Sequence, residues 1–198
     1  EINPNKYALN ISSLYERMGQ FDKAYQSLPK ELNIGKNEKP SDIEVRYFQR
    51  KAAWIIISQR NEELKQEGID SLNKLEELLF SHNEDNNPLW LWHFYNIKAN
   101  LHEWNNDLDE AIIFYKRCLS IPTLGAFEYG ATFVNMAITY RCKYIEQEIK
   151  KVATINKSIK LGRLGLLLKQ SVGEKDEMPV VLHNLALNIL YKISNTLI

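Results

Sequence analysis

Residues 95–122 read YNIKANLHEWNNDLDEAIIFYKRCLSIP and contain the strongest structural signal in the chain. Apolar residues recur at helical spacing on both sides of the polar segment NNDLDE, which predicts two amphipathic helices joined by a tight turn. Small residues stand at Ala99 and, twelve positions later, at Ala111. Because small side chains let two helices approach closely where they cross, the stretch predicts an antiparallel helix pair.

Other parts of the chain repeat this pattern with less regularity. Ser12 and Ala24 are separated by the same twelve residues, and Ala137 and Ala186 mark expected crossing points in two later helices. The segment 41–81 has the apolar stripe of an amphipathic helix pair but fits the small-residue pattern poorly. The chain is therefore expected to be a series of similar helix pairs.

The strongest pair resembles a tetratricopeptide repeat (TPR), a helix–turn–helix unit that stacks with its neighbours into a superhelix. The residues that carry the resemblance, in the order small, small, aromatic, small, proline, are Ala99, Ala111, Tyr115, Cys118 and Pro122. The resemblance implies an all-α fold, namely a right-handed α-solenoid of antiparallel helix pairs with about nine helices. We expect one TPR-like domain over residues 1–198, with pairs at approximately 4–32, 41–81, 88–121 and 126–171 and a capping helix at 176–196.

Two irregularities are expected within this array. Pro29 should end the second helix of the first pair early, because proline lacks a backbone N–H and clashes with the preceding turn. In the fourth pair the second small positions, Ser158, Gly162 and Gly165, come late after Ala137. We therefore expect an unusually long first helix that breaks near residues 154–156.

Composition excludes several classes of function. Lys+Arg and Asp+Glu number 25 each, so bulk charge gives no reason to invoke nucleic acid or an acidic membrane. No apolar run reaches the roughly 18 residues that span a bilayer. Two cysteines, Cys118 and Cys142, do not make a disulfide framework. We expect a cytoplasmic protein with no membrane or nucleic-acid partner, and the sequence leaves a homo-oligomer open.

The sequence shows no arrangement of residues that is typical of catalysis. His102 and Glu103 lack the second histidine that a zinc-binding helix requires. There is no cysteine pair at metal-ligand spacing, no glycine loop for phosphate and no nucleophile elbow. The chain is therefore expected not to be an enzyme and to bind neither a metal nor a cofactor.

The resemblance also indicates which residues to test for binding. In TPR proteins the first helix of each pair lines a concave groove that contacts an extended peptide. An asparagine amide both donates and accepts, so a ladder of asparagines can hold a peptide backbone, although asparagines in an Asn-rich chain can equally be solvated or structural. Tryptophan is favoured at binding hot spots, and arginine can pair with an acidic group. The candidate partner-binding residues are Asn10, Asn96, Asn100, Trp104, Asn135, Arg141 and Asn184.

The leading hypothesis is a non-enzymatic scaffold whose concave groove binds a protein segment or an extended peptide. An alternative is the peptide-sensing domain of a bacterial regulator that resembles quorum-sensing receptors, with a DNA-binding domain outside this chain. In such a regulator the peptide would shift the superhelix between two curvatures. A third hypothesis is a helical region that accompanies a catalytic domain outside this chain.

Overall fold

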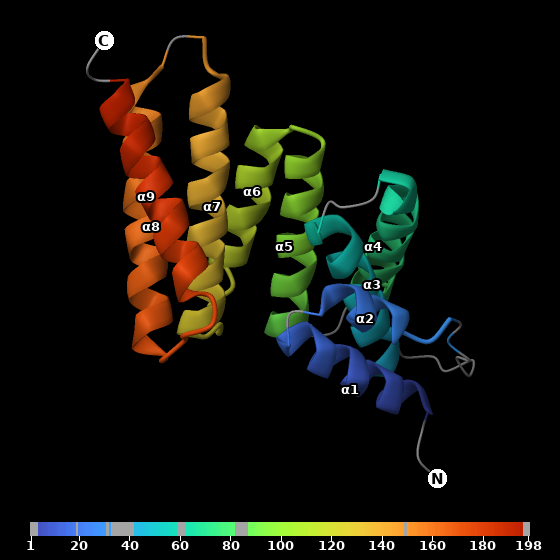
Figure 1. Cartoon of the computed structure of the whole chain (residues 1–198). Helices are drawn as coiled ribbons and strands as arrows, with labels where there is room; N and C mark the ends of the chain where they lie inside the picture. Colours follow the sequence, from blue (N-terminus) through green and yellow to red (C-terminus); the bar gives the residue numbers. More distant parts are fainter. Residues whose placement is uncertain are drawn as a thin grey trace. The chain divides into compact units, whose positions relative to one another are not determined.

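The computed structural model describes residues 4–18, 20–30, 32, 42–58, 62–81, 87–148 and 150–195. Within these residues the chain forms nine α-helices, one short 3-10 helix and no strand (Figure 1). The helices are α1 (Pro4–Arg17), α2 (Phe21–Gln26), α3 (Asp42–Ser58), η1 (Glu62–Leu64), α4 (Lys65–Phe80), α5 (Pro88–Trp104), α6 (Leu108–Leu119), α7 (Ala126–Glu146), α8 (Val152–Ser171) and α9 (Met178–Ser194). The predicted all-α class is confirmed, and the right-handed sense of the array stays a prediction.

The chain divides into two compact units, residues 1–97 (unit 1) and residues 98–198 (unit 2). The boundary falls inside α5, so this helix contributes its first part to unit 1 and its last turns to unit 2. The expectation of a single domain over residues 1–198 stays a prediction.

In unit 1, α1 packs against α2 and α3 packs against α4. Leu72, Leu75 and Leu79 form the buried stripe of α4, as their spacing of three and four residues predicts. They face a neighbouring helix, α3, whose Ile55 and Ile56 are also buried. The poorly matching segment 41–81 is thus a well-packed helix pair despite its unusual small positions.

The second helix of the first pair is very short. α2 contains only six residues and ends at Gln26, three positions before Pro29. The backbone N–H of Leu28 then bonds to the carbonyl of Tyr25 and turns the chain out of the helix. The predicted early end is confirmed, because a helix rarely continues into the residues that precede a proline.

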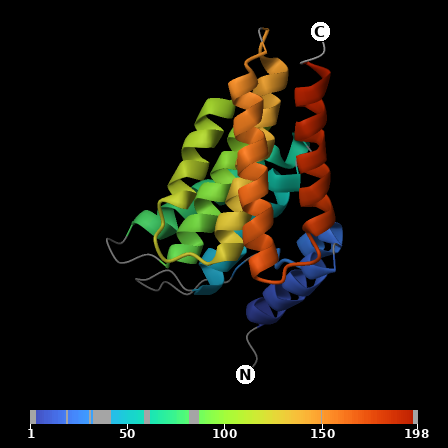
Figure 2. The same ribbon diagram turned by 90° about the vertical axis from the view of Figure 1, so that its left-hand side faces the viewer.

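In unit 2, α6 packs on α7, α7 on α8 and α8 on α9. Figures 1 and 2 both show α7, α8 and α9 lying side by side. The approach of α7 to α8 is especially close, because Gly165 brings the two backbones together. A Cβ atom built at Gly165 would lie 2.9 Å from the carbonyl oxygen of Gly130 and 3.1 Å from the backbone nitrogen of Val134.

The break between α7 and α8 lies earlier than expected. α7 is long, with 21 residues, but it ends at Glu146, and α8 already begins at Val152. The predicted break near residues 154–156 was therefore wrong. Gln147 has extended backbone angles, and its side-chain carbonyl accepts a hydrogen bond from the N–H of Lys151 at 3.3 Å. The sequence has neither glycine nor proline between the two helices to signal this break.

None of the helices in the described ranges combines the length and the apolar character that crossing a bilayer requires.

Candidate functional site

Two sequence-predicted residues of unit 2 meet between the first helices of successive pairs. Arg141 lies on α7, and its Nη1 donates to the backbone carbonyl of Asn184 on α9 at 3.2 Å. Its Nη2 donates to the side-chain oxygen of the same asparagine at 3.0 Å. Because the guanidinium group is a planar fork with fixed donor directions, these bonds hold α9 in register with α7.

The same guanidinium reaches a third acceptor that no sequence pattern had singled out. Nη1 of Arg141 also donates to Oδ1 of Asn188 at 3.2 Å. Asn188 is fully buried, and its Nδ2 has no hydrogen-bond partner among the described residues. Its position, four residues after Asn184 on the same helix face, is the signal that could have identified it.

A buried carboxyl group lies at the end of α5 in the same unit. Tyr115 of α6 donates from its hydroxyl to Oε2 of Glu103 at 3.2 Å, and Thr139 of α7 donates to the other carboxyl oxygen. Burial raises the pKa of Glu103, while the two hydrogen bonds act in the opposite direction. The carboxyl group thus joins three helices. In the sequence, Glu103 stands out only as half of an incomplete zinc motif.

The other candidates of unit 2 lie on α5 and α7, which are the first helices of their pairs. Asn100 is buried on the last turns of α5, and Trp104 at the end of that helix is partly exposed. Asn135 on α7 is also partly exposed, and its backbone carbonyl accepts a hydrogen bond from Thr139 at 3.0 Å. A partner could reach Trp104 and Asn135 more readily than Asn100.

Unit 1 contains the two remaining candidates. Asn10 is exposed on α1, and its side-chain oxygen accepts a hydrogen bond from Arg46 of α3 at 3.3 Å. Asn96 is buried on the first part of α5. The peptide-binding role of all seven candidates stays a prediction.

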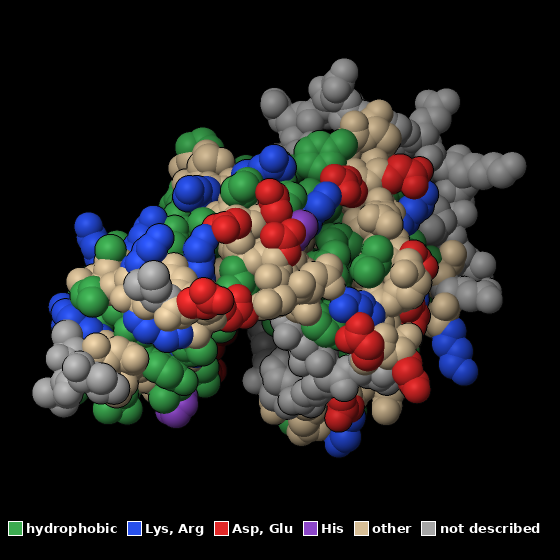
Figure 3. Space-filling model, turned by 90° about the horizontal axis from the view of Figure 1, so that it is seen from above, with side chains coloured by type: hydrophobic (Ala, Val, Ile, Leu, Met, Phe, Trp, Pro, Cys, Tyr) green, Lys and Arg blue, Asp and Glu red, His purple; other side chains and the backbone are tan. Residues whose placement is uncertain are grey.

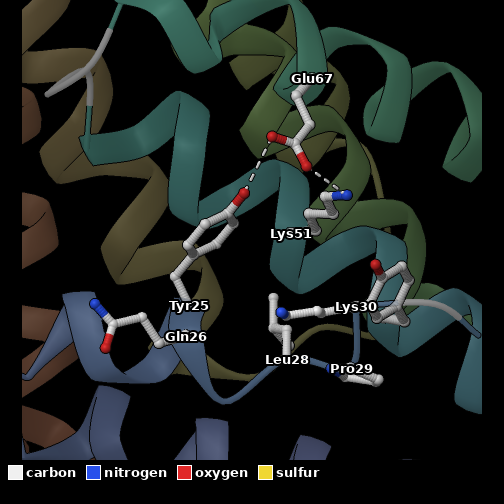
Figure 4. A pocket seen from close by; sticks show the side chains of 8 residues that line it. Tyr25, Gln26, Leu28, Pro29, Lys30, Lys51 and Glu67 are labelled. Atoms are coloured by element: carbon white, nitrogen blue, oxygen red, sulfur yellow. Dashed lines mark hydrogen bonds and ion pairs between the residues drawn. The ribbon is translucent and has the colours of Figure 1, made fainter.

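Unit 1 also contains a pocket that the sequence analysis did not predict (Figure 4). It is an open pocket of about 470 Å³, lined by residues of α2, α3, α4 and the turn after α2. Glu67 of α4 accepts a hydrogen bond from the Tyr25 hydroxyl at 3.1 Å and forms an ion pair of 2.6 Å with Lys51. These three residues come from separate helices, and the tyrosine and the glutamate are 42 positions apart, so sequence spacing could not group them.

Two polar groups of this pocket have raised pKa values. Burial and the nearby Glu67 carboxylate raise the pKa of Tyr25. Burial alone would lower the pKa of Lys51, but the hydrogen bond to Glu67 and the neighbouring Tyr47 bring it above its ordinary value. The tyrosine therefore stays neutral and the lysine stays charged at neutral pH. The pocket is of the size that accepts a side chain or a small ligand.

The described residues offer no metal centre and no reactive thiol at Cys118. No group of three or more His, Cys, Asp or Glu side chains within the described ranges is placed to hold a metal ion. Burial raises the pKa of Cys118 to about 12. Since the thiolate is the reactive form, this buried cysteine serves to fill space in α6.

The region that contains most of α5 and all of α6 matches a known protein family. A family model described as the tetratricopeptide repeat covers residues 93–122. No curated protein and no solved structure matches the chain. Together with the helical fold, the match shows a TPR-like helical repeat protein, and such repeats are typical of protein-interaction scaffolds.

Proposed function

We propose that this chain is a non-enzymatic scaffold and that the first-helix face of unit 2 binds an extended peptide segment of a partner protein. One observation carries the proposal. Arg141 has five N–H donors, of which three are used by the hydrogen bonds to Asn184 and Asn188. The side chain is only partly buried, so with respect to the described residues two donors remain for a carbonyl or carboxylate of the partner.

The bonds to α9 also prepare Arg141 for binding. A free arginine side chain loses rotamer entropy when it is immobilised by a partner, at a cost of about 0.5–1.5 kcal/mol. Arg141 is already fixed by three hydrogen bonds to α9, so much of this cost is met during folding. Asn135, six residues earlier on α7, supplies an amide that can pair with one peptide unit of any sequence.

The proposal is tested with random dodecapeptides displayed on phage, selected on the intact chain and then measured as synthetic peptides. We expect Arg141→Gln and Asn135→Ala each to weaken the selected peptides about tenfold, or roughly 1.4 kcal/mol. Asn73→Ala, at an exposed position on α4 in unit 1, is the matched control and should leave the affinity unchanged.

Circular dichroism of each variant separates lost binding from lost folding. If both variants keep their helical signal and bind the selected peptides as tightly as the wild type, the proposed face is not the peptide site. Failure of the selection to enrich any peptide at micromolar affinity would also count against the proposal.

A further inference from the structure

The last two helices of unit 2 differ from all the other described helices in charge. α8 and α9 contain no Asp or Glu, whereas each of the other described α-helices contains at least one. The whole chain is neutral, with 25 basic and 25 acidic residues, so this is a local segregation of charge. A basic surface without intervening carboxylates attracts an acidic partner.

A groove runs between these two helices, with a volume of about 520 Å³. Leu164, Leu167 and Ile193 form its apolar part, and Leu167 is 61% exposed. Its cationic part consists of Lys160, Arg163 and Lys192, and no acidic residue of the described ranges lines it. Figure 3 shows blue Lys and Arg side chains next to green hydrophobic ones on the side of the molecule where α8 and α9 lie.

The shape of the groove suits a helix. Ala186 on α9 is exposed, whereas the equivalent small residues of earlier first helices, Ser12, Ala99 and Ala137, are buried. The lining residues are three and four positions apart on each helix, which places each set on one helix face: Lys160, Arg163, Leu164 and Leu167 on α8, and Ile189, Lys192 and Ile193 on α9. An amphipathic helix presents apolar and charged side chains at the same spacing, so it can pack along both faces.

We infer that the α8–α9 groove binds an acidic amphipathic helix of a partner protein. The apolar stripe of that helix covers Leu164, Leu167 and Ile193, and its acidic flanks face Lys160, Arg163 and Lys192. This interaction is separate from the proposed peptide site, because it uses another surface and recognises a helix instead of an extended strand. Burial of the leucines supplies affinity, and the charges supply selectivity and association rate.

The test uses phage that display 18-residue helices with a fixed Leu/Ile stripe and flanks randomised among Glu, Lys, Gln and Ser. After selection on the intact chain, we expect the enriched helices to be rich in Glu and to bind more weakly as salt is raised. Arg163→Glu and Leu167→Asp should each reduce their affinity at least tenfold. Lys116→Glu and Ile113→Asp, at exposed positions on α6, are the matched controls and should not change it.

Any one of three results would overturn the inference. The selection could enrich helices without an acidic bias, the enriched helices could bind both groove variants as tightly as the wild type, or no helix could be enriched at micromolar concentration. Two further outcomes assign the groove to another occupant. Binding to phosphatidylserine vesicles that Leu167→Asp abolishes, without helix binding, would indicate a lipid surface. A dimer in sedimentation that Leu167→Asp dissociates, again without helix binding, would indicate a second copy of the chain.

One variant keeps this inference distinct from the proposed function. Asn135→Ala, on α7 and outside the residues that line the α8–α9 groove, should weaken the extended peptides while leaving the selected helices bound with wild-type affinity. If the helices bind and the extended peptides do not, the groove inference stands and the peptide site fails. The opposite pair of results supports the peptide site alone.

Discussion

The hydroxyl of Ser158 donates a hydrogen bond of 2.5 Å to the backbone carbonyl of Ala137, where α8 packs against α7. The first pair repeats this arrangement, because the hydroxyl of Ser12 donates to the carbonyl of Ala24 at 2.7 Å. In each pair a serine takes one small position and an alanine takes the other. The small positions therefore do more than avoid a clash, since a side chain also bonds to the facing backbone.

Ser158→Ala should lower the free energy of unfolding by about 0.5–1.5 kcal/mol, because the hydrogen bond is lost while the small volume is kept. Ser158→Leu should cost considerably more, since the residue is fully buried and the crossing cannot accept a larger side chain. Urea denaturation measures both. Ser171→Ala, at an exposed position near the end of the same helix, is the control with little expected change. Equal effects at positions 158 and 171 would contradict the role of the buried bond.

Gly165→Ala should destabilise unit 2 by about 1–3 kcal/mol, because the new methyl group would overlap with the backbone of α7. Gly162→Ala, one turn earlier on α8, provides the contrast. There the nearest atom is Cδ1 of Leu185 at 3.3 Å, the end of a flexible side chain. The gain in helix propensity, about 1 kcal/mol, should offset that contact and leave stability nearly unchanged. Thermal unfolding of the two variants measures both effects. A larger loss of stability for Gly162→Ala than for Gly165→Ala would be inconsistent with this packing.

His93 should make stability depend on pH. Burial, and secondarily the charge of Arg50, lower the pKa of His93 from 6.5 to about 4 in the folded chain. The unfolded chain therefore takes up the proton first, and stability is lost as the pH falls from about 6.5 towards 4, by up to roughly 3 kcal/mol. Urea unfolding at several pH values should show that His93→Gln lacks this part of the loss.

A control for His93 is available at its hydrogen-bond partner. Gln49→Ala removes the side chain that lies 3.4 Å from the imidazole but keeps the histidine itself. This variant should lower stability at every pH while retaining most of the pH dependence. A pH profile of His93→Gln that coincides with that of the wild type would show that the imidazole does not titrate differently in the two states.

Glu103 should make stability depend on pH in the opposite direction to His93. Its folded pKa is raised above 4.5, so the folded chain keeps a proton that the unfolded chain has already lost. The stability of the wild type relative to Glu103→Gln should therefore fall as the pH rises above 4.5, and the difference should be flat below that value. Thr139→Ala removes a hydrogen bond that holds this pKa down, so it should extend the dependence to higher pH. A constant difference between the wild type and Glu103→Gln across pH 4–8 would refute this account.

Local patterns in the sequence predicted much of the fold. The buried positions of Ser12, Ala99 and Ala137 follow from a twelve-residue spacing and from helical periodicity, which are visible within a single pair. The early end of α2 follows from the backbone chemistry of Pro29. The break before α8 could not be placed in this way, because no glycine or proline marks it in the sequence.

The candidate site was predictable only in its separate parts. The sequence placed Arg141 and Asn184 on successive first helices, and the structure brings them together through two hydrogen bonds. It gave no indication that Glu103 would be enclosed by Tyr115 and Thr139, since the last of these lies 36 positions away. Contacts of that kind depend on how the helices are rotated about their axes, which residue spacing alone does not specify.

The sequence by itself determined the helix pairs and the type of repeat, because helical periodicity and the sizes of Ala99 and Ala111 act over one or two turns. Only the tertiary structure decided which polar groups meet. The Lys51–Glu67 ion pair, the bonds of Arg141 to α9 and the groove beside Leu167 all arise from residues on different helices. Their physical origin is the close packing of whole helices, which fixes side-chain partners across distances that no local pattern records.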